Sequence, residues 1–286
     1  MKVLLTGGRG MLGRTIECVL GDIFEIVSTD LPEADITNEE VIDRVISKNK
    51  PDAVIHCAAA TDVEACEERV DFSFRINARG SANVAAACHR NGVRMIAIST
   101  DYVFDGDSKR PYTEFDRPTG GRNIYGQSKF AGEEMIRAIC PNHCICRVSW
   151  LYGFGGPSFV HTMLKLADGT RQVIKVVNDQ VGNPTSAIAV AEHMAMILSR
   201  QKLCGTFHLT CEGEASWADF AREIFLLAGR EQTVEGCTTD EYPCLAQRPK
   251  NSRLDKMGLR LVGLPPMPSW KEALKTFMEK EFGYCS

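Results

Sequence analysis

The sequence predicts an α/β protein with a doubly wound parallel sheet and a smaller α+β lobe at its C-terminal end. Short apolar runs alternate with amphipathic stretches over the first 150 residues, which is the pattern of successive βαβ units. These runs are continuously apolar instead of alternating with polar residues, as expected when helices cover both faces of a sheet. After residue 150 the alternation becomes irregular and prolines become frequent, which indicates a second, less regular lobe.

Each expected element follows from residue type and period. Strands are expected where aliphatic residues cluster, at 3–5, 25–27, 53–55, 95–98 and 145–148. Helices are expected where apolar residues recur every three or four positions, at 11–20, 38–49, 73–91 and 126–139. Beyond a glycine-rich loop at 153–157, we expect a helix at 158–168, a strand at 173–177, and helices near 186–199, 216–228 and 269–281.

Three glycines stand between the first expected strand and the first expected helix, in the spacing Gly7-x-x-Gly10-x-x-Gly13. This spacing suits a tight turn, a close backbone approach to a pyrophosphate, and packing of helix on strand, while the helix N-terminus offers free N–H groups. We therefore expect a Rossmann-type dinucleotide site that includes Gly7, Gly10, Met11, Leu12 and Gly13. The dinucleotide-binding domain is placed at 1–150, with segments around 173–190 returning to it, and 151–286 is mainly the substrate lobe.

Asp30 ends the second expected strand, where a carboxylate accepts hydrogen bonds from both adenosine ribose hydroxyls and repels a 2′-phosphate. By itself Asp30 favours NAD(H) over NADP(H). Arg9 in the glycine loop either offsets that repulsion or is a solvated charge, so the sequence leaves NADH and NADPH open. Further cofactor contacts are expected after the next strands, at Asp35, Ile36, Ala58, Ala59, Ala60 and Thr61.

Tyr125 and Lys129 lie four positions apart on an expected helix and so share one face. A fixed cation beside a phenol favours the phenolate and moves the tyrosine pKa from about 10 toward neutrality. The motif alone also suits a partly buried tyrosine beside a solvated lysine. Because Thr100 ends a strand shortly before the helix and offers a hydroxyl partner, we interpret Thr100, Tyr125 and Lys129 as a proton-donating catalytic group, with Tyr125 and Lys129 also at the cofactor.

Composition narrows the class of protein. A chain of 286 residues with 44% hydrophobic and 24% charged residues is an ordinary globular protein with one large core. The net charge of -4 gives no electrostatic reason to expect nucleic acid. No apolar run approaches the ~18 residues of a membrane span, and the N-terminus lacks a signal peptide, so we expect a cytoplasmic protein.

Twelve cysteines are scattered through the expected elements, and only Cys140, Cys144 and Cys146, with His143 among them, form a cluster. Either this cluster binds a metal, or its members are small buried side chains whose thiols stay reduced, as is usual in the cytosol. None of the six histidines has a ligand or triad spacing.

The chain resembles the extended short-chain dehydrogenase/reductases, and within them the branch that acts on sugar nucleotides. The resemblance spans nearly the whole chain. The general motifs are Thr6–Gly13 and Tyr125–Lys129, and the more specific ones are Ser99–Phe104, Arg147–Gly153, Asn178–Thr185 and Arg248–Leu254.

The resemblance implies NAD(P)H-dependent reduction of the C4 ketone of dTDP-4-dehydro-L-rhamnose to dTDP-L-rhamnose. It implies that Tyr125 gives a proton to the developing alkoxide, that Thr100 hydrogen-bonds the same oxygen, and that Lys129 holds the nicotinamide ribose and lowers the Tyr125 pKa. It places four further residues at the substrate: Asp101, Tyr102, Trp150 and Arg253. The alternative for Trp150 is an aromatic residue of the core. Arg253 either contacts the nucleotide, joins the lobes, or is a surface charge.

Some related enzymes dimerise through magnesium held by glutamates, and the matching positions here are Thr15 and Ile188. We therefore expect no metal, and a monomer or weak homodimer.

Two other functions stay open. One is another sugar-nucleotide reductase or an epimerase on the same scaffold; a dehydratase is disfavoured because Tyr102, and not glutamate, follows Asp101. The other is a non-catalytic protein resembling the regulatory subunit of methionine adenosyltransferase.

Overall fold

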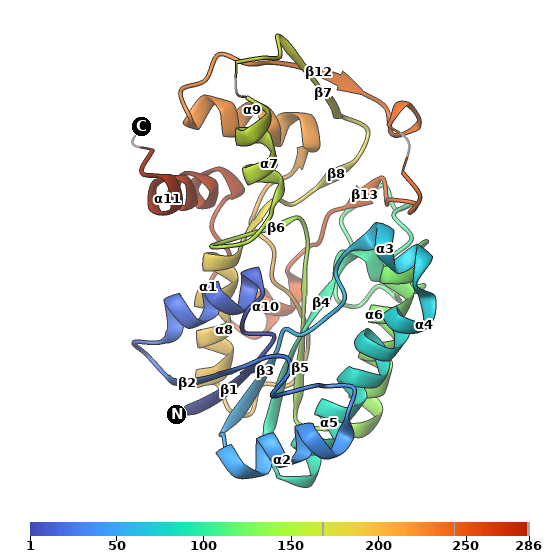
Figure 1. Cartoon of the computed structure of the whole chain (residues 1–286), viewed down its shortest axis with the longest axis vertical. Helices are drawn as coiled ribbons and strands as arrows, with labels where there is room; N and C mark the ends of the chain where they lie inside the picture. The colour runs from blue at the N-terminus through green and yellow to red at the C-terminus, as the bar shows by residue number, and fades with distance from the viewer. Residues whose placement is uncertain (168, 243, 285–286) are drawn as a thin grey trace.

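A six-stranded parallel sheet forms the centre of the larger lobe (Figure 1). The computed structural model describes residues 1–167, 169–242 and 244–284. The strands of the sheet are β1 (Lys2–Thr6), β2 (Glu25–Thr29), β3 (Ala53–His56), β4 (Arg94–Thr100), β5 (His143–Val148) and β10 (Gly205–His208). Their order is β10-β5-β4-β3-β1-β2. The first five are the strands predicted from apolar runs, and the doubly wound parallel sheet is confirmed.

Helices cover both faces of this sheet (Figure 1). On one face lie α1 (Met11–Leu20) and α8 (Ala187–Ser199), and on the other α2 (Glu39–Asn49), α5 (Ser81–Arg90) and α6 (Ile124–Ile139). Neighbouring residues of β1 point to opposite sides, so Val3 and Leu5 enter the core under α1 while Leu4 enters the core under α2. Burial on both sides explains why the strands are continuously apolar.

The helix predicted at 73–91 is not one regular α-helix. It comprises the end of α4 (Val70–Phe74), a π-helical segment η1 (Arg75–Gly80) and α5. A short helix that the sequence did not indicate, α3 (Val63–Glu68), precedes them, and Asp62 caps its N-terminus by accepting a hydrogen bond from Ala65 N.

The smaller lobe lies over the carboxyl ends of the sheet strands (Figure 1). Its helices are α7 (Phe159–Leu166), α9 (Trp217–Leu227) and α11 (Trp270–Phe282), whereas α10 (Met257–Leu261) packs against β10 of the larger lobe. Its short strands are β6 (Leu151–Tyr152), β7 (Val173–Val177), β8 (Val181–Gly182), β9 (Thr185–Ser186), β11 (Ala215–Ser216), β12 (Thr233–Cys237) and β13 (Asn251–Ser252). Two 3₁₀ turns complete the elements, η2 (Asp101–Val103) and η3 (Thr239–Glu241).

Of the segment 173–190 that was expected to return to the larger lobe, only the end, at the start of α8, packs there. The segment 173–177 forms β7 and pairs with β12 inside the smaller lobe, so it does not rejoin the large sheet. Instead α8 packs on α1, and β10 extends the sheet beside β5. The buried residues of α8 join the core that lies between α1 and the sheet, which accounts for the return. The division at residue 150 itself stays a prediction.

Two of the clustered cysteines, Cys140 and Cys144, each donate a hydrogen bond to a different backbone carbonyl. Cys140 Sγ donates to the Asn142 carbonyl at 3.7 Å, and Cys144 Sγ donates to the Leu203 carbonyl at 3.1 Å. Burial raises the pKa of both thiols and that of Cys146. In the described ranges, no group of three His, Cys, Asp or Glu side chains is arranged to hold a metal ion. Nor does any helix of those ranges have the length and apolar character needed to span a membrane.

Candidate active site

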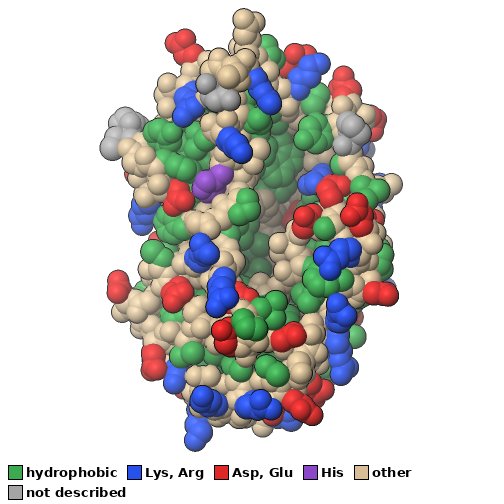
Figure 2. Space-filling view, viewed as in Figure 1, with side chains coloured by type: hydrophobic (Ala, Val, Ile, Leu, Met, Phe, Trp, Pro, Cys, Tyr) green, Lys and Arg blue, Asp and Glu red, His purple; other side chains and the backbone are tan. Residues whose placement is uncertain are grey.

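A cleft of about 520 Å³ lies at the carboxyl ends of the sheet strands, between the two lobes. Figure 2 shows it as a hollow in the middle of the molecule, with hydrophobic side chains on its upper wall. In a doubly wound sheet this edge is where ligands bind. The predicted cofactor residues that line the cleft are Gly7, Gly10, Met11, Leu12, Gly13, Asp30, Asp35, Ile36, Ala58, Ala59, Ala60, Thr61, Tyr125 and Lys129.

The glycine loop fits a dinucleotide because it has no room for side chains. Gly7 has φ +74°, and a Cβ there would lie 2.6 Å from Ala58 N. A Cβ at Gly13 would lie 2.3 Å from the Gly7 carbonyl oxygen. The N-cap of α1 is Gly10, which has no side chain to cap the helix, so the first N–H groups of α1 are free for an anion. The residues present therefore fit a cofactor pyrophosphate.

Asp30 and Arg9 lie together at the adenosine end of the predicted site. Asp30 Oδ2 accepts a hydrogen bond from Arg9 N at 2.9 Å, and Oδ1 accepts one from Leu31 N at 2.8 Å. The Arg9 guanidinium is exposed, donates to the Leu31 carbonyl at 2.9 Å and lies 3.8 Å from Glu33. The residue that carries this exposed cation thus also binds, through its backbone N–H, the carboxylate that was expected to exclude a 2′-phosphate.

Tyr125 lies in the first turn of α6, whose N-cap is Asn123. Asn123 Oδ1 accepts from Gly126 N at 2.8 Å, which fixes the start of the helix and the direction of the tyrosine. Burial of the phenol raises the Tyr125 pKa, and a hydrogen bond with Thr100 acts in the opposite direction. The phenol is consequently protonated at neutral pH, as a proton donor must be.

Lys129 does not lower the Tyr125 pKa as predicted. Its Nζ atom donates to the Ile98 carbonyl at 2.8 Å, and burial of the ammonium lowers the Lys129 pKa to about 8. Glu133, one helical turn further along α6, acts in the opposite direction. Desolvation of the phenol has the largest effect on the Tyr125 pKa, which explains why this pKa is raised and not lowered.

A buried ion pair supports this end of the cleft. Glu133 receives two hydrogen bonds from Arg147, at 2.9 and 2.7 Å, and one from Ser99 Oγ at 2.5 Å. Both charged side chains are 1% exposed. The pair joins α6 to β4 and β5, so Tyr125 and Thr100 are held on elements that cannot move independently.

Three of the predicted substrate residues line the same cleft, next to Tyr125. Asp101 is buried, which raises its pKa to about 6, and it accepts a hydrogen bond from the Thr100 hydroxyl at 3.0 Å. The Tyr102 ring meets the Tyr125 ring edge-on, with centroids 5.6 Å apart. Trp150 also borders the cleft, and its indole stacks on that of Trp217 with ring centroids 3.6 Å apart.

Arg253 is the predicted substrate residue that does not line the cleft. Its guanidinium pairs with Glu214 at 2.8 Å and donates to Asn251 Oδ1 and to the Lys109 carbonyl. Here it joins the lobes, because the strand β13 that carries Asn251 runs beside the loop at 105–116. The prediction of a direct substrate contact at Arg253 is therefore not supported by its position.

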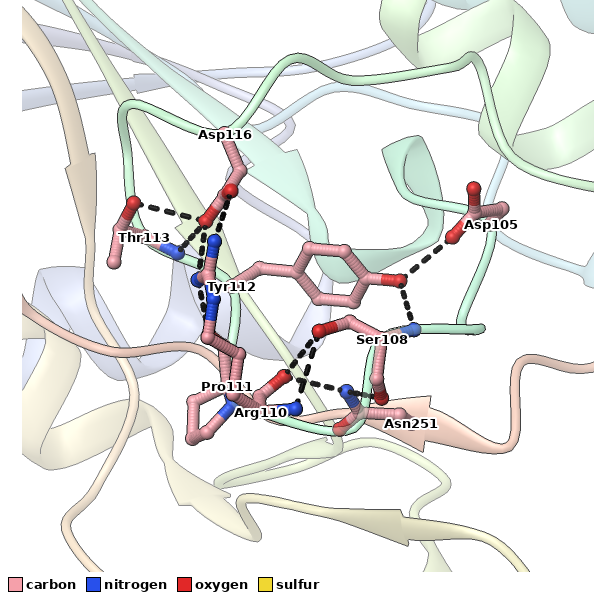
Figure 3. Close-up of polar contacts among 8 residues, drawn as sticks. All are labelled: Asp105, Ser108, Arg110, Pro111, Tyr112, Thr113, Asp116 and Asn251. Carbon is pink, nitrogen blue, oxygen red and sulfur yellow. Dashed lines mark hydrogen bonds and ion pairs between the residues drawn. The ribbon is translucent and has the colours of Figure 1, made fainter.

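Figure 3 shows how this loop is fixed. Asn251 Nδ2 donates to the carbonyls of Ser108 and Arg110, and the Tyr112 hydroxyl donates to Asp105 at 2.6 Å. Arg110 pairs with Asp116, which lowers the Asp116 pKa. The late motif thus holds the chain that follows Tyr102.

Two residues near the site were not predicted. Glu64, on the unpredicted helix α3, accepts a hydrogen bond from Arg248 Nη2 at 2.9 Å, and Arg248 Nη1 lies 3.5 Å from the Tyr102 hydroxyl. Arg248 opens the late motif that drew attention to Arg253, so the motif indicated the segment but not the arginine that reaches the cleft wall.

Comparison with known proteins shows which family the chain belongs to. The family model described as "RmlD substrate binding domain" matches residues 1–282. A dTDP-4-dehydrorhamnose reductase of Sinorhizobium fredii is 38% identical over 96% of both chains. A crystal structure of such a reductase from Clostridium acetobutylicum has a TM-score of 0.94 and 44% identity over 98% of this chain and 99% of that one. Another, from Bacillus anthracis in complex with NADP, has a TM-score of 0.95 and 38% identity over the same shares.

Proposed function

Because this chain belongs to the RmlD substrate-binding-domain family, whose curated relatives include dTDP-4-dehydrorhamnose reductases, we propose that its cleft reduces the C4 ketone of dTDP-4-dehydro-L-rhamnose to give dTDP-L-rhamnose. The observation that carries the proposal is the convergence of Thr100, Tyr125 and Lys129 on a cleft whose floor is a glycine-rich dinucleotide turn. The NADP complex of the Bacillus anthracis relative supports NADPH as the cofactor.

The glycine loop, Asp30 and the segment 58–61 hold the cofactor, and Lys129 holds its nicotinamide ribose. A bound NADPH supplies the hydride that adds to the C4 carbon. The chain supplies the rest: Tyr125, whose protonated form is favoured further by burial, gives its proton to the C4 oxygen, and Thr100 donates a hydrogen bond to the same oxygen. Asp101 and Tyr102 lie beside the sugar.

The test compares the wild-type protein with Tyr125→Phe in an assay of NADPH oxidation with dTDP-4-dehydrorhamnose. Loss of the general acid should lower kcat by ~10²–10⁴-fold. NADPH affinity, measured by fluorescence titration, should stay within about twofold because the hydroxyl makes no pyrophosphate contact. Wild-type kcat in the variant would show that the acid is another group.

The same assay separates the other functions left open by the sequence. An epimerase returns its hydride to the sugar and so consumes no NADPH over a complete turnover, and a non-catalytic subunit consumes none at all. Stoichiometric oxidation of NADPH by the wild-type protein is the result that the proposal requires.

A further inference from the structure

Three consecutive residues at the end of β4 each hydrogen-bond to one face of α6, and the pairs are Ile98 with Lys129, Ser99 with Glu133 and Thr100 with Tyr125. The three partners on α6 follow one another at four-residue intervals, which places them on the same side of the helix. Tyr125 and Lys129 have roles in the proposed reaction. The Glu133 carboxylate is 1% exposed, and it continues the same face of α6 from the cleft into the core.

Glu133 lies between two buried cations. On one side is Lys129, whose Nζ atom is bound to β4 and whose charge acts on His56 and Cys57 of β3. On the other side is Arg147 of β5, which donates to Glu133 at 2.9 and 2.7 Å. Because β4 lies between β3 and β5 in the sheet, the carboxylate separates the two charges. Without it, Lys129 and Arg147 would repel each other in a region that water does not screen.

Glu133 is also the ionised neighbour that stabilises the Lys129 ammonium. Burial lowers the Lys129 pKa to about 8, and Glu133 and Cys57 act in the opposite direction. Burial raises the Cys57 pKa to about 12 and lowers the His56 pKa to about 3, so both side chains are neutral at pH 7. The Tyr125 phenol, whose pKa burial raises, is neutral as well. The negative charge next to Lys129 is therefore that of Glu133.

The other ionisable groups on the elements packed against α6 are exposed, neutral or held by other partners. The exposed ones are Glu68, Arg69, Asp71, Arg75, Arg79, His89 and Arg90. Burial raises the pKa of three others, which are Cys66, Cys88 and Tyr102. Five more have partners of their own: Glu64 pairs with Arg248, Glu67 accepts from Ile124 N, Arg94 donates to the Ile197 carbonyl, Asp101 accepts from the Thr100 hydroxyl, and His143 contacts the Cys140 carbonyl.

The carboxylate of Glu133 is kept ionised and fixed in place by its partners. Burial opposes its ionisation, but the hydrogen bonds and charge of Arg147, the charge of Arg137 and the hydrogen bond from Ser99 together lower the Glu133 pKa to about 2. Ser99 Oγ donates to Oε1 at 2.5 Å, and Arg137 Nη2 donates to Oε2 at 2.7 Å. Since both oxygens are bound from three elements, β4, β5 and α6, the carboxylate cannot turn away from Lys129.

We propose that Glu133 is a positioning residue for the cofactor, whose fixed carboxylate separates Lys129 from Arg147 and so keeps the Lys129 ammonium charged for the nicotinamide ribose. The inference rests on the proposed function, because it is there that Lys129 binds the ribose of NADPH. Among the described residues, those that line the cleft include Lys129 but not Glu133. Removing the Glu133 charge should therefore change how cofactor binding depends on pH, without removing a contact to the cofactor.

The experiment measures the Kd for NADPH by fluorescence titration between about pH 6.5 and pH 9.5. In the wild-type protein the Kd should rise above about pH 8, as Lys129 loses its proton. Glu133→Gln keeps the shape of the side chain and leaves Lys129 facing the Arg147 charge, so the rise should begin about one pH unit lower. The variant should then bind NADPH ~10-fold more weakly than the wild-type protein at about pH 9, and within about twofold of it at about pH 6.5.

Glu134→Gln is the matched control. Glu134 is the next residue of α6 and also pairs with Arg137, at 2.6 Å, but its side chain is 59% exposed. The variant should reproduce the wild-type pH curve because water screens this charge. Glu133→Asp, which keeps the charge on a shorter side chain, should restore most of the wild-type curve, whereas a purely structural role would not distinguish charge from shape.

Arg137→Gln tests the same inference without disturbing the buried pair. Arg137 is 31% exposed and offsets part of the Glu133 charge from the outer side of the helix. Its removal should therefore move the rise in Kd to higher pH, opposite to the effect of Glu133→Gln, by a fraction of a pH unit. If Glu133→Gln does not fold, the direction of this shift decides the question.

Four results would overturn the inference: a wild-type Kd that does not rise above about pH 8, a Glu133→Gln Kd raised by the same factor at every pH, an equal shift in Glu134→Gln, or an Arg137→Gln curve that stays in place or moves to lower pH. Failure of the proposed function is a separate result, the absence of NADPH oxidation by the wild-type protein. An active wild-type enzyme whose Glu133→Gln variant keeps the wild-type pH curve would refute the Glu133 assignment alone.

Discussion

Lys129 has a pKa that burial lowers to about 8. In the proposed mechanism its charged ammonium holds the cofactor ribose. As the pH rises through that value the ammonium loses its proton, so kcat/KM should fall about tenfold per pH unit on the alkaline side. Well below that pH nearly all of the Lys129 side chains are charged, so kcat/KM should not change with pH through this group.

A pH profile of kcat/KM checks this prediction because that ratio reports the free enzyme. Lys129→Met should lower the activity and remove the limb, since the titrating group is gone. An alkaline limb that survives in Lys129→Met would assign the titration to another residue.

We predict that Asp30 and Arg9 together set the preference between NADH and NADPH. Removing the carboxylate with Asp30→Ala should shift the ratio of kcat/KM values toward NADPH, and removing the cation with Arg9→Gln should shift it toward NADH. Asp30 also accepts from Arg9 N, so Asp30→Ala should loosen the glycine loop and weaken both cofactors. Steady-state kinetics with each cofactor checks both variants. A ratio that neither variant changes would mean that these side chains do not face the ribose.

The glycine loop between β1 and α1 gives a prediction at the scale of an element. At Gly13 a Cβ would lie 2.3 Å from the Gly7 carbonyl oxygen and 2.7 Å from Gly8 Cα, both backbone atoms that cannot move aside. Gly13→Ala should therefore raise the Kd for NADPH by at least about tenfold and lower the Tm.

Gly92→Ala is the matched control. Gly92 also has a positive φ, +67°, but no heavy atom lies within 4 Å of a Cβ there. It should cost about 1 kcal/mol of stability from backbone strain and leave the NADPH Kd unchanged. If Gly13→Ala and Gly92→Ala have the same effect on Kd, close packing in the loop is not what the cofactor requires.

The elements that could be predicted are those whose burial is reflected in the hydrophobicity of their own residues. β1, β3, β4 and β5 are almost wholly buried, so each contains an apolar run, whereas the edge strand β2 is half-buried and only its Ile26 and Val27 gave the signal. β10 has the sequence Gly-Thr-Phe-His and becomes a strand only because β5 offers its edge. Glu64 and Arg248 meet although they lie 184 positions apart, and no local pattern connects them. Thr100 and the segment 58–61 were predictable because strand ends of a parallel sheet share one edge, and Tyr125 was predictable from its spacing to Lys129 on one helix face.

At the scale of the whole molecule, one hydrophobic core runs from the large sheet into the smaller lobe. It includes Ile16 of α1, Val190 of α8, and Phe220 and Phe277 of the smaller lobe. Thr15 and Ile188 are buried at the α1–α8 packing, and Thr15 Oγ1 accepts from Phe154 N at 3.1 Å. Neither position offers a carboxylate at the surface for a metal between two copies of the chain.

We therefore expect reduction to proceed without added metal. Activity after exhaustive treatment with EDTA should equal activity with excess Mg²⁺, because in the proposed mechanism Thr100 and Tyr125 stabilise the alkoxide without a metal. The sedimentation mass should be the same under both conditions. Loss of activity on chelation, or a dimer that forms only with Mg²⁺, would contradict this expectation.

The late addition of β10 and α8 to the larger lobe also affects synthesis on the ribosome. When β5 has emerged, its outer edge and the apolar surface of α1 are still uncovered, because their partners lie beyond the whole of α7 and β7. At ~5–20 residues per second, this gap lasts for roughly several seconds. During that time the nascent chain exposes a strand edge that invites pairing with other chains. The protein should therefore depend on chaperones that bind nascent polypeptides, and a fragment truncated at residue 150 should aggregate.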